Sequence, residues 1–315
     1  MNATRRALLA ALEDGAVGGP TLADRLGVSR AAVWKQVEAL RDEGFVIESG
    51  DEGYRVVGVP DYGPAALAFG LEAPYNIEYE AQVASTNDRA REHAEEGAAD
   101  VVVVADEQTG GRGRLDREWT APSGGVWASL VLRPERPPAA VPMYTLAAAV
   151  AVARAARGAG VNASIKWPND VLVAGPDSEE AKLCGILTEM EGEADRVSWL
   201  VIGVGVNANI DRKTLPAGAT SLRAEVGDVD RRRFLQRVLG GVHDLTGEGA
   251  DLRAVLDAWR EYASTLGRRV RVETPRRVVE GRAVDVQFPG SLIVETDNGE
   301  RVVHAGDCEH LRPTR

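Results

Sequence analysis

The sequence predicts a multidomain α/β protein, because three regions of the chain carry different hydrophobic patterns. The first 60 residues combine helical spacing with a turn-rich strand pair, residues 75–265 alternate strand-like and helical stretches, and residues 266–315 contain short strands. A chain of 315 residues is also longer than one hydrophobic core usually supports. We therefore expect three domains, spanning residues 1–60, 75–265 and 266–315, with a linker rich in Gly, Ala and Pro over residues 60–74. Within the central domain, residues 101–105, 126–132 and 199–206 are strand-like, and residues 145–157 and 252–266 have helical composition.

The first region is expected to form a helix-turn-helix followed by a β-hairpin wing. Apolar residues recur at helical spacing over residues 3–12, and a short second helical run follows. Ser29 is a good N-cap for a third helix over residues 30–43. Two strand-like segments then flank the turn-rich residues 49–53, which predicts the hairpin. Together these elements indicate a winged helix.

A recognition helix presents its first residues to base edges in the major groove. The candidate DNA-contacting residues are Ser29, Arg30, Trp34 and Lys35. Residues 1–60 nevertheless hold nine acidic and seven basic side chains, with Asp51 and Glu52 at the expected wing tip. Because carboxylates repel phosphate, docking of a protein or regulation of the neighbouring domain is an alternative to DNA binding. Trp34 also fits a position in the core of this domain.

Charge and cysteine content exclude several classes of protein. The formal net charge is −11, and four of the 37 basic residues are lysines, so the whole chain is a poor general binder of nucleic acid. Cys184 and Cys308 are too few and too distant for a disulfide framework or a metal-ligand cluster, so we expect buried thiols and no metal-ligating residues. Apolar runs such as residues 146–153 are shorter than the ~18 residues of a membrane span. With no signal peptide evident, we expect a cytoplasmic protein without a membrane partner.

Two motifs of the expected central domain carry polar and cationic side chains. Ser85-Thr86-Asn87 places three hydrogen-bonding groups at a helix entrance, where they could also serve only as a cap. The stretch from Gln108 to Trp119 follows a strand, and its glycines allow a ligand to approach the backbone closely. Arg112, Arg114 and Arg117 add forked cationic donors suited to phosphate. The lysine–serine pair of a P-loop does not follow.

Two further motifs contain two of the four lysines. Lys166-Trp167-Pro168-Asn169-Asp170 ends a strand with a rigid proline, which suits a loop that delivers Asn169 and Asp170 to a site. Lys182-Leu-Cys-Gly-Ile-Leu-Thr-Glu189 alternates like a strand and is expected to point Lys182 and Cys184 to one face. A compact ammonium group suits a position beside a developing phosphate or acyl oxygen.

A fifth motif, Ile202-Gly-Val-Gly-Val-Asn207, follows these four, and all five stand in the order and approximate spacing found in biotin–protein ligases. The chain resembles this family, in its bifunctional form with an N-terminal helix-turn-helix biotin operon repressor domain. The resemblance covers nearly the whole chain. It implies a winged helix, a central class II synthetase-like mixed sheet and a small C-terminal SH3-like β-barrel.

The resemblance implies a ligase that joins biotin to ATP with Mg²⁺, giving biotinyl-5′-AMP. The biotin then passes to a lysine of the biotin carboxyl carrier domain of an acyl-CoA carboxylase. Operator DNA would be a second partner, bound by a homodimer on paired half-sites. Two alternatives stay open: a lipoate or octanoyl transferase of the same superfamily, and a biotin-sensing transcription factor without catalysis. The glycine-arginine stretch and the Lys166 motif favour biotin over lipoate, and Lys182 favours catalysis.

Motif matching assigns expected roles to single residues. Lys182, Arg114 and Asp170 are the candidate catalytic residues, and Asp170 would either take up magnesium or help the acceptor amine lose its proton. The expected biotin contacts are Ser85, Thr86, Asn87, Gln108, Arg112, Gly113, Arg114 and Lys182. The expected nucleotide contacts are Lys166, Trp167, Asn169, Asn207 and Arg312. The chain departs from the family at Asp116, where a glycine is usual, and this adds negative charge to the loop.

Overall fold

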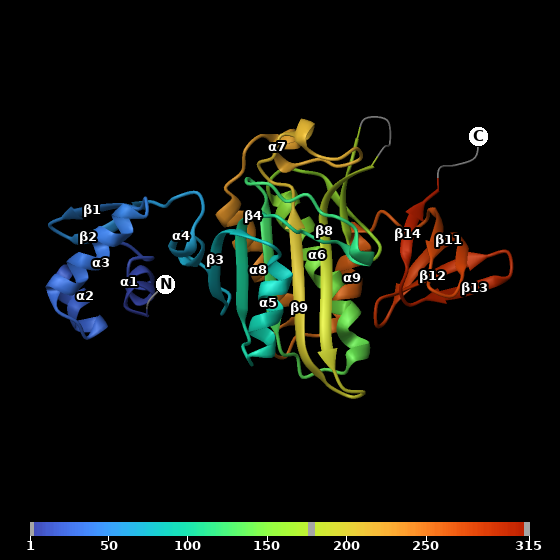
Figure 1. Cartoon of the computed structure of the whole chain (residues 1–315), viewed down its shortest axis with the longest axis horizontal. Helices are drawn as coiled ribbons and strands as arrows, with labels where there is room; N and C mark the ends of the chain where they lie inside the picture. The colour runs from blue at the N-terminus through green and yellow to red at the C-terminus, as the bar shows by residue number, and fades with distance from the viewer. Residues whose placement is uncertain (1–2, 176–179, 312–315) are drawn as a thin grey trace.

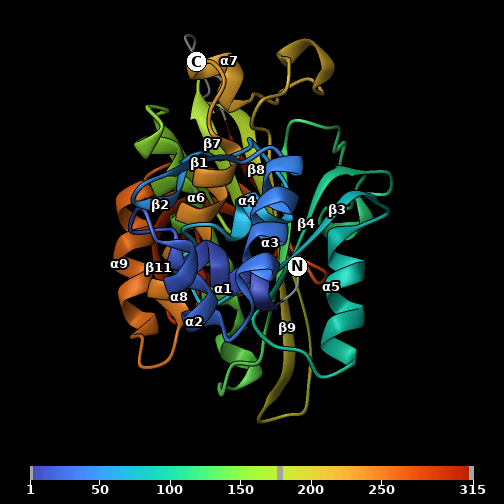
Figure 2. The same ribbon diagram turned by 90° about the vertical axis from the view of Figure 1, so that its left-hand side faces the viewer.

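A computed structural model describes residues 3–175 and 180–311, without the side chain of Asp116. Three groups of elements follow one another along the long axis of the molecule (Figure 1). Seen from the N-terminal side, the first group lies in front of the central one (Figure 2).

The N-terminal group consists of three helices and one antiparallel hairpin, as the hydrophobic pattern predicts. Ser29 caps the third helix, because its Oγ accepts a hydrogen bond from the amide of Ala32 at 3.2 Å. Val33 and Val37 are buried in the core of this group, whereas Trp34 is 57% exposed, so the core alternative for this tryptophan is wrong. The elements are α1 (Ala3–Ala11), α2 (Gly19–Leu26), α3 (Arg30–Asp42), β1 (Val46–Gly50) and β2 (Gly53–Gly58).

The segment after the hairpin, which the sequence suggested to be a linker, contains the buried helix α4 (Pro64–Ala68). Ala65 and Ala66 belong to the N-terminal core, while Leu67 belongs to the core of the central group. Proline is well suited to the first turn of a helix and alanine is the best helix former, so burial on two sides orders this short segment.

The central group is built on a seven-stranded mixed sheet in the order β3-β4-β5-β9-β8-β7-β6. β3 and β4 pair in parallel, and the remaining neighbours pair antiparallel. The strands are β3 (Asn76–Val83), β4 (Val101–Gln108), β5 (Val126–Leu132), β6 (Ala163–Lys166), β7 (Asp170–Ala174), β8 (Glu180–Gly192) and β9 (Val197–Val206).

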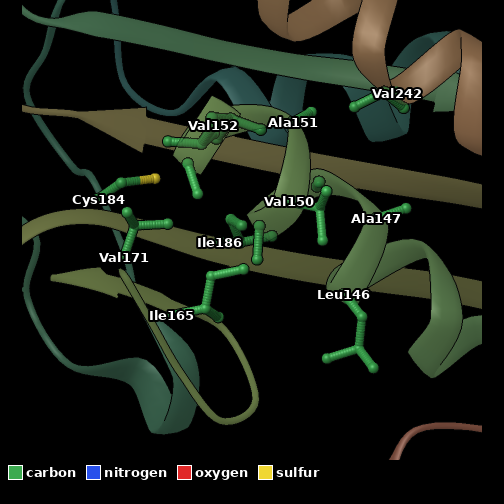
Figure 3. Packing of buried hydrophobic residues seen from close by; sticks show 14 of the residues in the cluster. Leu146, Ala147, Val150, Ala151, Val152, Ile165, Val171, Cys184, Ile186 and Val242 are labelled. Carbon is green, nitrogen blue, oxygen red and sulfur yellow. The ribbon is translucent and has the colours of Figure 1, made fainter. Parts of the chain in front are cut away.

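Helices cover both faces of this sheet. On one face, Ala90 of α5 (Thr86–Glu95) packs against Val103 and Val201. On the other face lie α6 (Val141–Gly158), α8 (Arg231–Thr246) and α9 (Leu252–Tyr262), and the short helix α7 (Leu222–Val226) follows β9 at one end of the sheet. Figure 3 shows Val150 of α6 near Ile186 of β8 and Ile165 of β6, in the same hydrophobic core. Helical composition had suggested that the last helix continues to residue 266, but Ala263 instead pairs with Ile165 in a parallel bridge.

The stretch Pro138–Gly158 is long and apolar enough to cross a membrane by length and composition alone, with a mean hydropathy of 1.5. In the structure 72% of that window is buried. Core helices of globular domains pass the same test, so this stretch is weak evidence for a span.

The C-terminal group is a five-stranded antiparallel sheet in the order β13-β12-β11-β10-β14. Its inner side chains, among them Val270 and Leu292, join the same continuous core as the central sheet. The predicted short strands are confirmed. They are β10 (Arg269–Glu273), β11 (Val278–Gln287), β12 (Ser291–Thr296), β13 (Gly299–Val303) and β14 (Asp307–His310).

Candidate functional site

A cavity of about 300 Å³ gathers residues from many parts of the chain. Its lining comes from the start of α5, the end of β4, the following loop, strands β7, β8 and β9, residues 215–219 and Asp307. Four basic and three acidic side chains line it, although the whole chain has a net charge of −11. A cationic, partly enclosed cavity in an acidic protein suits an anionic ligand.

A polar network lines one end of the cavity. The Thr86 amide and hydroxyl both donate to Gln108 Oε1, at 2.7 and 3.0 Å. The Ser129 hydroxyl lies 2.7 Å from Thr86 Oγ1 and 2.6 Å from Asn87 Oδ1. The Asn87 amide donates to Glu189 Oε2 at 2.7 Å. Fixed donors and acceptors of this kind can recognise a small polar ring.

Ser85 combines the two roles that the sequence left open. Its Oγ accepts a hydrogen bond from the amide of Asp88 at 3.3 Å, which caps α5, and the residue also lines the cavity. The neighbouring Ser129 and Glu189 were not predicted as site residues. The signal for Ser129 was a lone hydroxyl within the otherwise apolar strand β5, where its side chain is fully buried.

Asp170 lies between two ammonium groups. Its Oδ1 is 2.7 Å from Lys182 Nζ, and its Oδ2 is 3.1 Å from Lys166 Nζ. Asp170 and Lys182 line the cavity, whereas Lys166 does not and reaches the site only through this carboxylate. The Lys182 ammonium also lies over the ring of Trp119, 5.1 Å from its centre.

Simple alternation predicted that Lys182 and Cys184 share one face of the strand, and the structure shows that they do not. The register between β7 and β8 shifts at this point, so that Val171 pairs with Cys184 but Leu172 pairs with Lys182. Cys184 therefore enters the hydrophobic core while Lys182 lines the cavity. Burial raises the pKa of the Cys184 thiol far above its ordinary value, so it is an inert core residue. Both cysteines are free and buried, as expected.

The glycine-arginine loop, residues 109–122, forms part of the cavity lining. Arg114 Nη1 donates to Asn169 Oδ1, and Nη2 donates to the carbonyl oxygen of Gly306, both at 2.9 Å. Burial lowers the pKa of the Arg114 guanidinium, which still carries its charge at neutral pH because arginine titrates far above it. Arg112 pairs with Asp88, and Arg117 pairs with Asp307 at 2.5 Å.

Trp119 lines the cavity, although the sequence assigned it no role. Its indole Nε1 is buried and has no hydrogen-bond partner in the part of the chain that the structure describes. An unpaired buried donor is costly, so a ligand acceptor that meets this nitrogen would be favoured. Residues 215–219, which also line the cavity, were missed because no local pattern marks them.

The expected nucleotide contacts divide into four groups. Lys166 does not line the cavity and contacts Asp170. Asn169 and Asn207 are buried and line the cavity. Trp167 is a correction, because it is 1% exposed, belongs to the hydrophobic core and donates from Nε1 to the carbonyl oxygen of Gly290. Trp167 therefore packs in the core beside the C-terminal sheet and does not contact the cavity. Arg312 lies outside the described residues.

Gly203 sets the size of the cavity at the polar network. A Cβ atom at this position would lie 2.1 Å from Asn87 Oδ1, and hydrogen bonds hold that side chain in place. We expect Gly203→Ala to weaken binding of biotin, the ligand that the sequence resemblance implies, by about 10- to 100-fold, because overpacking a buried site typically costs ~1–3 kcal/mol. Isothermal titration with biotin measures the effect. Gly240→Ala is the matched control, since an added Cβ meets nothing within 4 Å there, and equal affinity of both variants would contradict the prediction.

Comparison with known proteins identifies the family. A model of the biotin/lipoate A/B protein ligase family matches residues 79–207, a biotin protein ligase C terminal domain matches residues 265–311, and an HTH domain matches residues 4–55. The chain is 37% identical over 310 residues to the bifunctional ligase/repressor BirA of Bacillus subtilis, covering 93% of each protein. This chain belongs to the bifunctional biotin ligase/repressor family.

Other members of the ligase/repressor family and its relatives extend the likeness. The biotin–[acetyl-CoA-carboxylase] ligase of Mycobacterium tuberculosis is 35% identical over 243 residues, which cover 74% of this chain and 88% of that one. Among solved structures, a biotin protein ligase from Aquifex aeolicus in complex with biotin and ATP superposes with a TM-score of 0.61 at 26% identity. It covers 75% of this chain and 99% of its own. The resemblance that the five motifs predicted is thereby confirmed.

Proposed function

We propose that this protein is an ATP-dependent biotin–protein ligase that forms biotinyl-5′-AMP and transfers biotin to a lysine of a biotin carboxyl carrier domain of an acyl-CoA carboxylase. The observation that supports this most directly is the convergence of Lys182, Asp170 and Arg114 beside the polar network. Cationic groups and a carboxylate next to a polar recognition site match the needs of acyl adenylation and amine acylation.

In the first half-reaction, a biotin carboxylate oxygen bonds to the α-phosphorus of ATP and pyrophosphate leaves. Thr86, Asn87 and Gln108 of the polar network, together with the adjacent Ser85, hold the biotin ring. Lys182 and Arg114, with Arg112 and the backbone of Gly113, neutralise charge on the carboxyl and phosphoryl oxygens. Positioning and charge neutralisation supply most of the rate enhancement in such reactions. The loop that carries both arginines also shields the mixed anhydride from water.

In the second half-reaction, the acceptor lysine amine attacks the acyl carbon, an amide bond forms and AMP leaves. Asp170 is an acceptor-only group at the cavity wall, held in position by two ammonium groups. It can therefore take the proton that the amine loses. Asn169 and Asn207, which line the cavity, would contact the nucleotide, and Lys166 would act on it only through Asp170.

Magnesium fits this site as a companion of the nucleotide. The described residues contain no group of three or more histidine, cysteine or acidic side chains that could hold a metal ion. The ion usually keeps several waters and binds mainly through substrate phosphates, where it neutralises their charge. Asp170 is the cavity carboxylate that could add one ligand, and its ion pairs with the two lysines compete with that contact.

We also propose that the N-terminal group is a winged helix that binds operator DNA as part of a homodimer and represses transcription in response to biotin. Arg30, Trp34 and Lys35 at the start of α3 would face the bases, with Ser29 as the cap. In this assignment the three domains span residues 1–60, 75–265 and 266–315, and the last is an SH3-like barrel. An HTH domain match over residues 4–55 supports the DNA-binding role.

Pyrophosphate release, combined with carrier labelling and biotin binding, distinguishes the proposed ligase from its alternatives. The pure protein is incubated with biotin, labelled ATP and Mg²⁺, and pyrophosphate release is measured without any acceptor. Release with biotin, together with labelling of a carrier domain, supports the ligase. Release with lipoate but not biotin indicates an enzyme that activates lipoate, and transfer of an octanoyl group from an activated donor without pyrophosphate release indicates the octanoyl transferase. Biotin binding without pyrophosphate release indicates a sensor without catalysis, and a salt-controlled operator titration tests repression separately.

Asp116 places a carboxylate in the loop where relatives usually have glycine. We expect Asp116→Gly to change the release rate of biotinyl-AMP more than the rate of its formation, because charge and backbone freedom affect how the loop closes. Stopped-flow displacement and pyrophosphate release measure the two rates. Unchanged release of the intermediate would contradict this prediction.

A further inference from the structure

Arg231, the first residue of α8, joins three segments that are far apart in the sequence. Its side chain is 9% exposed. Nη1 donates to Asp106 Oδ1 at 2.7 Å and to the carbonyl oxygen of Gly125 at 3.2 Å, while Nη2 donates to Asp61 Oδ2 at 3.1 Å. The guanidinium also lies 4.2 Å from the ring centre of Tyr62. One nearly buried cation thus contacts β4, the entrance to β5 and the segment before α4.

Asp106 and Gly125 form the base of the glycine-arginine loop. Asp106 precedes Gln108 of the polar network by two residues, and its carboxylate accepts a hydrogen bond from Ser123 at the other end of the loop. Burial opposes ionisation of Asp106, but hydrogen bonds from Ser123 and Arg231 outweigh it and lower the pKa of this carboxyl group. The Arg231–Asp106 pair, through its hydrogen bonds with Gly125 and Ser123, therefore holds together the chain before and after the loop.

The same helix holds the far end of α4. Arg232 Nη1 donates to the carbonyl oxygen of Phe69 at 3.1 Å, and Gln236 Nε2 donates to it at 2.9 Å. The Phe69 ring packs edge-on against Phe45, with the ring centres 6.0 Å apart, and Phe45 belongs to the N-terminal core. The first turns of α8 therefore hydrogen-bond to the chain before α4, at Asp61, and directly after it, at Phe69. Through these contacts α8 is connected to the N-terminal group.

We propose that Arg231 is a positioning residue for the glycine-arginine loop and that Asp61 is its anchor on the N-terminal side. Arg231 does not line the cavity and acts through Asp106 and Gly125. The rate at which biotinyl-AMP leaves the site then depends on whether Asp61 keeps its contact with Arg231, because Arg231 in turn holds the base of the loop. The inference rests on the proposed ligase function, because biotinyl-AMP is the ligand whose retention it concerns.

Two variants and a matched control test the proposal in the full-length protein. Arg231→Gln removes the cation, and Asp61→Asn removes only the anchor, whose side chain is 60% exposed and whose loss is compatible with folding. Arg233→Gln is the control, because this neighbouring arginine is 69% exposed and lies 3.4 Å from Asp230. We expect Arg231→Gln to speed release of biotinyl-AMP by about tenfold or more, because it removes nearly buried hydrogen bonds from a charged group. We expect Asp61→Asn to speed release by about threefold, because a partly exposed ion pair contributes less. The rate of adenylation at saturating biotin should fall by a smaller factor than release rises, because Arg114 is also held by its hydrogen bonds to Asn169 and Gly306.

A second readout needs no ligand. Trypsin cleaves after arginine, and Arg112 and Arg117 in the loop are 42% and 65% exposed. We expect both variants to be cut in the loop faster than the wild type and the Arg233→Gln control. Unchanged loop cleavage together with unchanged release in Asp61→Asn would overturn the proposal, even if Arg231→Gln failed to fold. If the wild type forms no biotinyl-AMP but the variants are still cut faster, the proposed function fails while the role of Arg231 stands.

Discussion

Replacing Lys182 by methionine is expected to slow biotinyl-AMP formation by about 10²- to 10³-fold, the usual effect of losing one preorganised group that stabilises developing charge. Methionine keeps much of the length and packing of the side chain but removes the ammonium that lies 2.7 Å from Asp170 Oδ1. The measurement is the single-turnover rate of pyrophosphate release with saturating biotin and ATP.

Two further variants define what the Lys182 result means. Lys213→Met is the matched control, because this exposed lysine is absent from the cavity lining and should leave the rate unchanged. Combining Lys182→Met with Arg114→Met should remove carrier labelling almost entirely, since in the proposed mechanism both cations act on the same mixed anhydride. Labelling at the original rate in the double variant would refute the proposed enzyme mechanism.

Asp170→Asn is expected to slow transfer of biotin to the carrier lysine by about 10²- to 10⁴-fold, the range for a lost general base. The substitution preserves shape but removes the negative charge that two lysines contact. Transfer is measured in a single turnover from preformed biotinyl-AMP, so that adenylation does not enter the rate.

The matched control for Asp170 is Asp228→Asn, because Asp228 pairs with Arg223 on the surface and is not among the cavity-lining residues. If Asp170→Asn transferred biotin at the wild-type rate, the amine would lose its proton to another group. If adenylation fell as much as transfer, the main role of Asp170 would be to hold Lys182 rather than to act as a base.

Local patterns were sufficient for much of the fold. Apolar spacing and the cap at Ser29 predicted the three N-terminal helices, and strand-like composition predicted β4, β5 and β9. The helix α4 was missed because its order comes from burial between two cores and not from its own composition. The separation of Lys182 from Cys184 was missed because it depends on the register of a neighbouring strand.

The candidate site was predicted where function is concentrated in short motifs. Ser85-Thr86-Asn87, Asn169, Asp170 and Lys182 do surround one cavity. Contacts between residues remote in sequence were not predictable in the same way. Ser129 meets Asn87 across 42 positions, and Arg114 meets Gly306 across 192, so only the folded chain shows that these side chains act together. Trp167 fitted the motif but serves packing.

The helix α4 has a consequence for how such proteins can be recombined. Two of its alanines complete the hydrophobic interior of the N-terminal group, and the adjoining leucine completes that of the sheet behind it. A chimera that joins this ligase to a foreign DNA-binding module at the end of the hairpin would leave one interior open to solvent. The N-terminal group therefore cannot be exchanged on its own. A functional exchange must keep α4 together with the residues of α8 that hydrogen-bond to it.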